Sequence, residues 1–430
     1  MTLAPFASPL YVMAKPVGSL CNLACDYCYY LEKHHLYASE QSRQHIMSDA
    51  TLEAYIRQYI ESQTQPEVLF TWHGGEPLMR PLSFYQRVVA LQRQYAQGHL
   101  IDNCLQTNGT LLTDEWCAFF RRHNWLIGIS IDGPEQLHDH YRLTRRRQPS
   151  FQRVMRGIRL LQKHGVEWNA MGVVNRINAD HPLDVYHFYK DIGCRYIQFT
   201  PIVERLQAHP DGRHLAQAPT FRSAHRDAPH LENSSLGACD ASLCEELSTL
   251  SSPLAPYSVL PGQYSHFVCT LFDEWVRHDV GEVFVQLFDS TLARWMNQAP
   301  GVCSMAETCG HAAALEHNGD LYSCDHYVFP DFLLGNIHTS PIASLMYSPR
   351  QLAFGRSKRD ALSARCRGCQ WLFACNGGCP KDRFLDSENY LCQDYRSYFD
   401  HVTPYMDFMR NELLHQRPPA NIMSSTLVQP

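Results

Sequence analysis

Hydrophobic and polar positions follow two alternating periods in the first half of the chain. Short apolar runs, typical of buried strands, are separated by stretches in which apolar residues recur every three or four positions, as on one face of a helix. Six strands, each joined to the next by a helix, favour a parallel sheet with right-handed crossovers. The predicted strands span residues 10–15, 68–73, 103–107, 126–131, 169–174 and 196–200, and the predicted helices 51–62, 82–95, 114–123, 150–164 and 182–191.

The pattern changes after the sixth predicted strand. Residues 205–262 are rich in Pro, Ser, Ala and His and have little apolar periodicity, which indicates an insertion or linker. Beyond it the pattern predicts a helix over 264–278, a short strand over 283–288 and a helix over 402–414. The expected segments are a strand–helix segment at 1–204, the insertion at 205–262, a connecting helix and strand at 263–302, a cysteine-rich segment at 303–400, and a C-terminal helix and tail at 401–430.

Composition narrows the class of protein. Hydrophobic residues at 45% and charged residues at 19% over 430 residues are typical of a globular enzyme-sized chain. The net charge of −6 is mild, so we expect neither nucleic-acid nor membrane-surface binding. The N-terminus lacks a basic start followed by a long apolar run, and no stretch reaches eighteen apolar residues. We therefore expect a cytoplasmic protein.

The chain has seventeen cysteines, and the redox state of its compartment indicates what they do. The cytoplasm is reducing, and an odd number of cysteines cannot form a closed set of disulfides. Ligation of metal ions or clusters is the favoured role for most of them. The six cysteines outside the motifs described below are interpreted as core or loop thiols, namely Cys104, Cys117, Cys194, Cys239, Cys244 and Cys269.

The first cysteine motif follows the first predicted strand. Cys21, Cys25 and Cys28 have C-x3-C-x2-C spacing. Three thiolates on one short loop can hold three irons of a 4Fe–4S cluster and leave the fourth iron open to a small molecule. A zinc site is the alternative, with His34 or His35 as its fourth ligand.

Further polar motifs follow the later strands, where catalytic groups of such folds gather. Gly74, Gly75 and Glu76 follow the second strand, Gln106-Thr-Asn-Gly the third, and Ser130-Ile-Asp-Gly-Pro the fourth. Two glycines allow close approach of backbone to a ligand, and a carboxylate suits an ammonium group. Taken singly, these residues could also be ordinary turn or surface residues.

These motifs together resemble the radical S-adenosylmethionine (SAM) superfamily, whose signature has an aromatic residue before the last cysteine, as Tyr27 is here. The resemblance implies a partial (β/α)6 TIM-type barrel in which the open iron binds the amine and carboxylate of SAM. Electron transfer then splits SAM into methionine and a 5′-deoxyadenosyl radical. The SAM contacts that the resemblance implies are Tyr27, Gly74, Gly75, Glu76, Ser130, Arg142 and Val203.

A second set of eight cysteines lies near the C-terminus and suffices for two fully ligated 4Fe–4S clusters. A pair of zinc knuckles is the alternative that spacing leaves open. The set resembles the SPASM domain of peptide-modifying radical SAM enzymes. By that resemblance one auxiliary cluster is held by Cys303, Cys309, Cys324 and Cys379, and the other by Cys366, Cys369, Cys375 and Cys392.

Within that group the chain most resembles the anaerobic sulfatase-maturating enzymes. The match extends from Met13-Ala-Lys-Pro to Asn376-Gly-Gly-Cys-Pro-Lys and is most specific at Ser323-Cys-Asp-His-Tyr. It implies oxygen-independent conversion of a Ser or Cys in a sulfatase polypeptide to formylglycine. It also implies a low-potential electron donor such as flavodoxin or ferredoxin.

The implied chemistry requires a base. After a hydrogen atom leaves the substrate Cβ, the hydroxyl or thiol must lose a proton while one more electron departs. Asp325 directly follows the proposed ligand Cys324, and the resemblance makes it this base. The alternative is an aspartate that orients a ligand or caps a helix. Tyr30 is expected to line the substrate channel.

Two other functions remain open at this point. One is a SPASM enzyme that forms thioether or carbon–carbon crosslinks, although Cys21 comes too early to leave room for the N-terminal peptide-binding domain that such enzymes often carry. The other is a non-enzymatic multi-cluster electron carrier, which would not need a SAM site.

Overall fold

The computed structural model describes residues 10–37, 45–208, 214–216, 254–384 and 388–428. Cys239, Cys244 and most of the predicted insertion lie outside these residues. Within them, no helix is long and apolar enough to cross a membrane.

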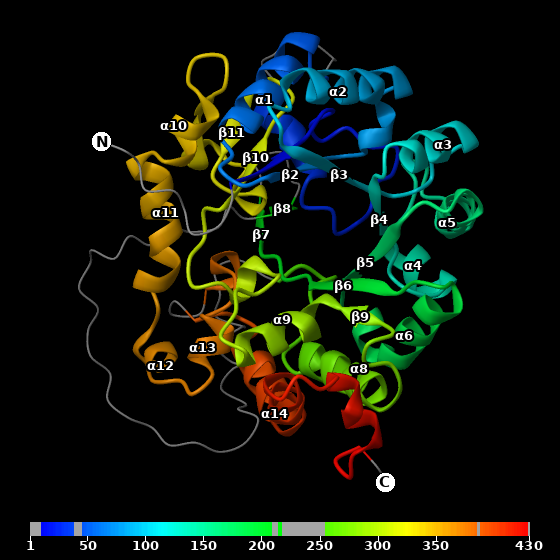
Figure 1. Ribbon diagram of the computed structural model, residues 1–430, viewed down its shortest axis with the longest axis vertical. Helices are drawn as coiled ribbons and strands as arrows, with labels where there is room; N and C mark the ends of the chain where they lie inside the picture. The colour runs from blue at the N-terminus through cyan, green and yellow to red at the C-terminus, as the bar shows by residue number, and fades with distance from the viewer. Residues whose placement is uncertain (1–9, 38–44, 209–213, 217–253, 385–387, 429–430) are drawn as a thin grey trace.

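The predicted parallel sheet is confirmed, and its strands stand side by side in chain order, as in a partial barrel (Figure 1). Neighbouring strands pair in parallel throughout this part of the sheet. The six strands are β1 (Tyr11–Ala14), β2 (Glu67–Trp72), β3 (Leu100–Thr107), β4 (Leu126–Ser130), β5 (Trp168–Val174) and β6 (Tyr196–Pro201).

Helices connect these strands on the outside of the sheet (Figure 1). Ser48 and Thr113 cap two of them by accepting backbone N–H bonds from the first turn. One helix, α4, was not predicted, because its seven residues are too few to show helical periodicity. The helices are α1 (Asp49–Glu61), α2 (Leu82–Tyr95), α3 (Asp114–Arg122), α4 (Glu135–Tyr141), α5 (Phe151–His164) and α6 (Pro182–Asp191).

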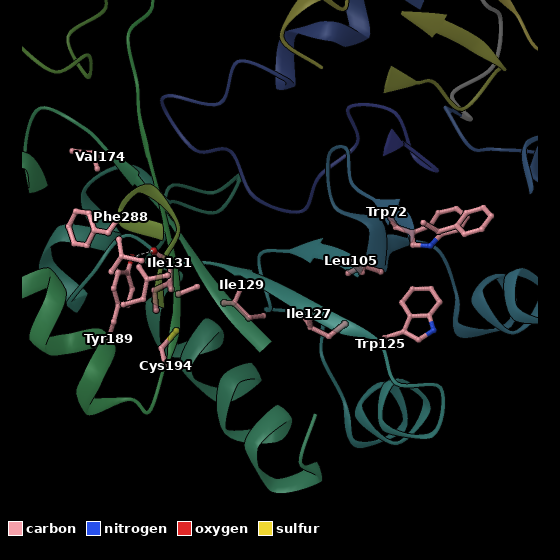
Figure 2. Packing of buried hydrophobic residues seen from close by; sticks show 14 of the residues in the cluster. Trp72, Leu105, Trp125, Ile127, Ile129, Ile131, Val174, Tyr189, Cys194 and Phe288 are labelled. Carbon is pink, nitrogen blue, oxygen red and sulfur yellow. Dashed lines mark hydrogen bonds between the residues drawn. The ribbon is translucent and has the colours of Figure 1, made fainter. Parts of the chain in front are cut away.

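The core lies between the sheet and these helices. Alternate strand residues such as Trp72, Leu105 and Ile127 point outward and are buried (Figure 2). Residues on the opposite face, such as Thr71 and Cys104, are paired in register and line the inside of the barrel. Because the strands are parallel, their carboxyl ends lie together at one mouth of the barrel, and the polar motifs follow there.

Four further strands complete a ten-stranded sheet, and the sequence predicted only part of them. β10 pairs in parallel with β1, so the cysteine-rich segment shares a sheet with the barrel. Its sequence, Ala-Ala-Ala-Leu, lacks the β-branched residues that mark strands, which explains why it was not predicted. The strands are β9 (Phe284–Val285), which pairs with β6, then β10 (Ala312–Leu315), β11 (Asp320–Tyr322) and β12 (Leu333–Asn336).

Two predicted elements needed correction. The strand predicted over 283–288 is limited to β9, because a helix, α9 (Gln286–Trp295), begins directly after it and buries Phe288 and Trp295 on one face. The helix predicted over 402–414 begins earlier, as α14 (Cys392–Leu414). Its buried residues Tyr398 and Val402 continue one apolar stripe across Pro404, which the helix includes.

The remaining helices belong to the C-terminal part of the chain. α8 confirms the helix predicted over 264–278 and packs against α14. The set is α8 (Gln263–His278), α10 (Ile342–Met346), α11 (Pro349–Asp360), α12 (Ala364–Arg367) and α13 (Leu372–Cys375).

Candidate active site at the mouth of the barrel

The loop that carries Cys21, Cys25 and Cys28 lies at the carboxyl end of β1. A backbone hydrogen bond ties this loop to the chain after α4: the Ala24 N–H donates to the Leu143 carbonyl at 2.8 Å. The three thiols come from one tight stretch of chain, and a backbone N–H faces the Cys21 sulfur at 3.4 Å. This donor set fits three irons of a 4Fe–4S cluster with one iron left open.

The Gly74–Gly75 pair supports this loop. The Gly75 N–H donates to the Gly18 carbonyl, and the Glu76 N–H donates to the Leu20 carbonyl, each at 2.7 Å. A Cβ at Gly75 would lie 1.9 Å from the Leu20 oxygen. Only glycine fits there, so the motif after β2 sets the position of the cysteine loop.

The arrangement of thiols bears on the zinc alternative. Among the residues that the structure describes, no three Cys, His, Asp or Glu side chains come close enough together to hold a single metal ion. Burial, followed by the charge of Glu76, raises the pKa of Cys21 to about 12, so iron ligation must displace the thiol proton.

Glu76 lies fully buried between two loops. Its carboxylate accepts bonds from the Thr107 hydroxyl at 2.7 Å, the Asn108 N–H at 2.8 Å and the Leu78 N–H at 2.9 Å. Burial raises the pKa of Glu76 to about 7, although these donors pull it down. Glu76 thus ties the motif after β2 to the motif after β3, and its contact with SAM stays a prediction.

Tyr27 and Arg142 meet at a residue that the sequence did not single out. The Tyr27 hydroxyl donates to the Asp132 carboxylate, and Arg142 Nε lies 2.9 Å from the same oxygen. The Arg142 guanidinium also lies over the Tyr27 ring, 5.4 Å from its centre. The sequence signal that could have identified Asp132 was its place in the motif after β4. Burial would lower the pKa of Arg142, but the charge of Asp132 raises it above its usual range.

Ser130 and Val203 line other parts of the mouth. Gln106 Nε2 donates to Ser130 Oγ at 2.9 Å, and Gly128 leaves space for the Gln106 amide. Val203 is buried, and its carbonyl accepts a bond from Lys381 Nζ at 2.9 Å. Val203, one of the implied SAM contacts, is therefore joined directly to the cysteine-rich segment.

Asp325 lies where the barrel and the cysteine-rich segment meet. Lys15, at the end of β1 and 0% exposed, forms an ion pair with its carboxylate. The Tyr29 hydroxyl, from the cysteine loop, donates to the other carboxylate oxygen. Burial would raise the pKa of Asp325, but the charges of Lys15, His73 and His326 outweigh it and hold the pKa below its usual value. The carboxylate is therefore ionised at neutral pH.

The eight C-terminal cysteines separate into two neighbourhoods. Burial, and then the nearby thiols Cys303, Cys309 and Cys379, raise the pKa of Cys324. Burial and the thiols Cys366 and Cys369 are among the causes that raise the pKa of Cys375 to about 11. Burial, followed by the charges of Glu388, Cys375 and Cys366, raises the pKa of Cys392 to about 12. These sets match the two quartets that the resemblance implied. Ligation by each cysteine stays a prediction.

Two cations next to these thiols, the buried Lys358 and the half-buried Arg383, were missed by sequence reasoning. Lys358 Nζ donates to the carbonyls of Cys303 and Ser304 at 2.9 and 2.8 Å. Arg383 donates to the carbonyls of Asn376 and Gly377. Their sequence signal was only a pair of basic residues within the cysteine-rich segment. Such cations offset the negative charge of thiolate-ligated iron.

Comparisons with known proteins agree with this geometry. The model of the Radical SAM superfamily matches residues 16–189, and the SPASM model, an iron–sulfur cluster-binding domain, matches residues 303–370. The chain is 57% identical to a serine-type anaerobic sulfatase-maturating enzyme of Bacteroides thetaiotaomicron, over 99% of this chain and 97% of the relative. It is 29% identical to a cysteine-type enzyme of Clostridium perfringens, over 94% of this chain and 99% of the relative.

A solved structure extends the likeness to three dimensions. The structure of anSMEcpe with bound AdoMet and the Cp18Cys peptide has a TM-score of 0.76 and 28% identity, and the match covers 94% of this chain and 100% of that one. The sequence identity, the two matched domains and the shared fold all point the same way. The chain belongs to the anaerobic sulfatase-maturating enzymes of the radical SAM superfamily.

Proposed function

We propose that this enzyme oxidises a serine in the active-site motif of a sulfatase polypeptide to formylglycine, without oxygen. The preference for serine is supported by the 57% identity to a serine-type enzyme, against 29% to a cysteine-type enzyme. The observation that carries the proposal is the ionised Asp325, held by Lys15 and Tyr29 beside the cysteine loop.

Three 4Fe–4S clusters and SAM fit the donor groups described above. Cys21, Cys25 and Cys28 would hold the cluster that binds SAM, and the two C-terminal quartets would hold the auxiliary clusters. SAM supplies a carbon radical strong enough to take a hydrogen atom from an unactivated Cβ, and the auxiliary clusters supply an acceptor for one electron.

The residues of this chain supply binding, orientation and proton transfer. Converting a CH2–OH group to an aldehyde removes one hydrogen atom, one proton and one electron. Asp325 takes the hydroxyl proton, and the Tyr29 hydroxyl and Lys15 fix the direction of its free lone pairs. Arg142, Asp132 and Tyr27 form a buried group that orients SAM.

The test is anaerobic incubation of the reduced, iron-loaded enzyme with SAM and sulfatase-motif peptides that contain either Ser or Cys. Mass spectrometry measures the aldehyde and 5′-deoxyadenosine. We expect faster aldehyde formation from the Ser peptide. Cys28→Ala should abolish both products, because it removes an iron ligand.

Asp325→Asn should retain cleavage of SAM and lower aldehyde formation by about 100-fold or more, as expected for loss of a general base. Asp331→Asn, an exposed aspartate six residues further along the chain, is the matched control and should behave as the parent enzyme. Unchanged aldehyde formation by Asp325→Asn would exclude Asp325 as the base.

A further inference from the structure

One stretch of the chain is strongly basic although the whole protein carries a net charge of −6. Residues 142–166 contain no Asp or Glu, and they contain Lys163 together with seven arginines. The stretch begins as a small hairpin, in which Leu143 bridges Pro149, and continues into α5. The arginines are Arg142, Arg145, Arg146, Arg147, Arg153, Arg156 and Arg159.

The hairpin lies directly on the loop that carries the first cysteine motif. Arg145 Nε donates to the Cys21 carbonyl at 2.7 Å. Arg147 forms an ion pair with Asp26, the residue next to Cys25. Both arginines are exposed, so they connect the cysteine loop to the protein surface.

The first turns of α5 reach the same loop from a second direction. Arg156 Nη2 donates to the Thr110 carbonyl at 2.9 Å, and the Thr110 hydroxyl accepts a bond from Asn22 of the cysteine loop at 2.8 Å. A Cβ on Gly157 would lie 2.3 Å from the Gly109 oxygen, so the helix packs tightly on this region. We call the exposed residues Arg145, Arg146, Arg147, Arg153 and Arg156 the arginine face.

Carboxylates form ion pairs with three of these eight cations: Asp132 with Arg142, Asp26 with Arg147, and Asp114 with Lys163. Each of these pairs offsets one positive charge, and five arginines of the stretch remain to give the surface its charge. Asp139 accepts the backbone N–H groups of Ser150 and Phe151 at the start of α5. The arginine face is therefore an exposed positive surface above the proposed SAM-binding cluster.

We propose that the arginine face is the docking surface for an acidic one-electron carrier protein of the flavodoxin or ferredoxin class. This inference rests on the proposed function, which needs one electron to enter at the cluster held by Cys21, Cys25 and Cys28. The carrier loses one electron, the cluster gains it, and no atom is transferred. Exposed Asp26 adjoins Cys25, so this surface offers a carrier a short approach to the cluster.

Charge complementarity gives this partner its chemistry. A positive surface steers an acidic protein and raises its rate of association, and salt weakens the effect. Nucleic acid is also attracted to arginine, but it has no reason to bind over a redox centre. The position of the arginine face beside the cysteine loop favours a carrier protein over nucleic acid as the partner.

The experiment uses the double charge reversal Arg146→Glu/Arg153→Glu in the full-length, iron-loaded enzyme. Neither side chain makes the hydrogen bonds described above that hold the cysteine loop. The matched control is Arg277→Glu/Arg410→Glu, with exposed arginines on α8 and α14. These helices lie at the bottom of Figure 1, whereas α5 lies at its right.

Aldehyde formation from the Ser peptide is measured with three electron donors: reduced flavodoxin, reduced ferredoxin and reduced methyl viologen, a small cation. With at least one carrier protein, we expect the test variant to be about tenfold slower at low salt and to lose the salt dependence of the parent enzyme. With methyl viologen, its rate should equal or exceed that of the parent. The control variant should match the parent throughout.

Binding of the oxidised carriers, measured by calorimetry, gives a readout that does not depend on turnover. The dissociation constant should rise about tenfold for the test variant only. The proposal is overturned if the test variant keeps parental rates and affinity with both carriers, or if it loses activity equally with methyl viologen. Tighter binding of a DNA or RNA oligonucleotide than of either carrier would also overturn it. Absence of aldehyde with every donor would instead reject the proposed function, while carrier binding would still report on docking.

Discussion

At the scale of single residues, the ion pair between Lys15 and Asp325 fixes the position of the proposed base. Lys15 is fully buried, and its ammonium also lies 4.0 Å from the centre of the Tyr30 ring. A buried lysine is tolerated only when its charge is compensated, and Asp325 compensates it. Each partner therefore stabilises the other in a site that excludes most water.

Lys15→Met should leave the Asp325 carboxylate, whose side chain is only 19% exposed, without its cation. We expect a loss of about 3–5 kcal/mol in the free energy of unfolding, the usual cost of breaking a buried pair. Aldehyde formation should fall more than cleavage of SAM, because the base loses its orientation. Anaerobic thermal unfolding and product analysis measure the two effects.

The double variant Lys15→Met/Asp325→Asn provides the control. It removes both charges, so its free energy of unfolding should lie closer to that of the parent than that of Lys15→Met does. Equal destabilisation of the single and double variants would show that Lys15 acts through packing and not through Asp325.

Residue-level prediction from sequence succeeded where the signal was local. The cysteine motifs and the Gly-Gly-Glu motif are short, and their spacing alone marks them. Lys15 and Tyr29 were missed as partners of Asp325, because about 300 residues separate them along the chain and no spacing rule links them. Asp132 lies only ten residues before Arg142, yet it was missed as its partner, because the loop that brings the two side chains together is visible only in the fold.

At the scale of elements, the close approach of the Gly74–Gly75 turn to the cysteine loop depends on a missing side chain. Gly75→Ala would bring a Cβ to 1.9 Å from the Leu20 oxygen, a backbone atom that cannot turn aside. We expect the cysteine loop to shift, with weaker SAM binding and iron content reduced by about one cluster's share. Iron analysis and equilibrium binding of SAM measure these changes.

Gly98→Ala is a suitable comparison for Gly75→Ala. Nothing lies within 4 Å of the added Cβ, so the only cost is the backbone strain of a positive φ angle. This variant should keep its full iron content. Equal loss of iron in both variants would mean that the turn does not position the cysteine loop.

Elements were predictable where their periodicity was long enough. The strands and helices of the barrel follow one pattern repeatedly, and they were found. β9 was predicted too long, because Leu287 and Phe288 are apolar in both a strand and the helix α9. The start of α14 was missed, because the cysteines before residue 402 indicated a cluster-binding loop. The apolar stripe that includes Tyr398 indicates the helix.

At the scale of the whole molecule, the barrel sheet joins a strand near the N-terminus to a strand of the cysteine-rich segment, about 300 residues further along the chain. β1 lies between β2 and β10, with Val12 in register with Ala313. Removing every residue after 302 would delete β10 and leave β1 with an unpaired edge. We expect this truncated protein to aggregate, as measured by size-exclusion chromatography.

Cys369→Ser in the full-length chain is the comparison for this truncation. It removes a proposed ligand of the second auxiliary cluster but keeps β10 and its pairing with β1. This variant should elute as the parent does, with less iron. A monodisperse truncated protein would show that the barrel is complete without β10.

The pairing of β10 with β1 also affects how the enzyme tolerates damage. Asp325 reaches the barrel mouth on a short path from β10 and β11, and main-chain hydrogen bonds fix this path. We therefore expect that loss of iron from the proposed quartet of Cys366, Cys369, Cys375 and Cys392 leaves Asp325 in its place beside β1.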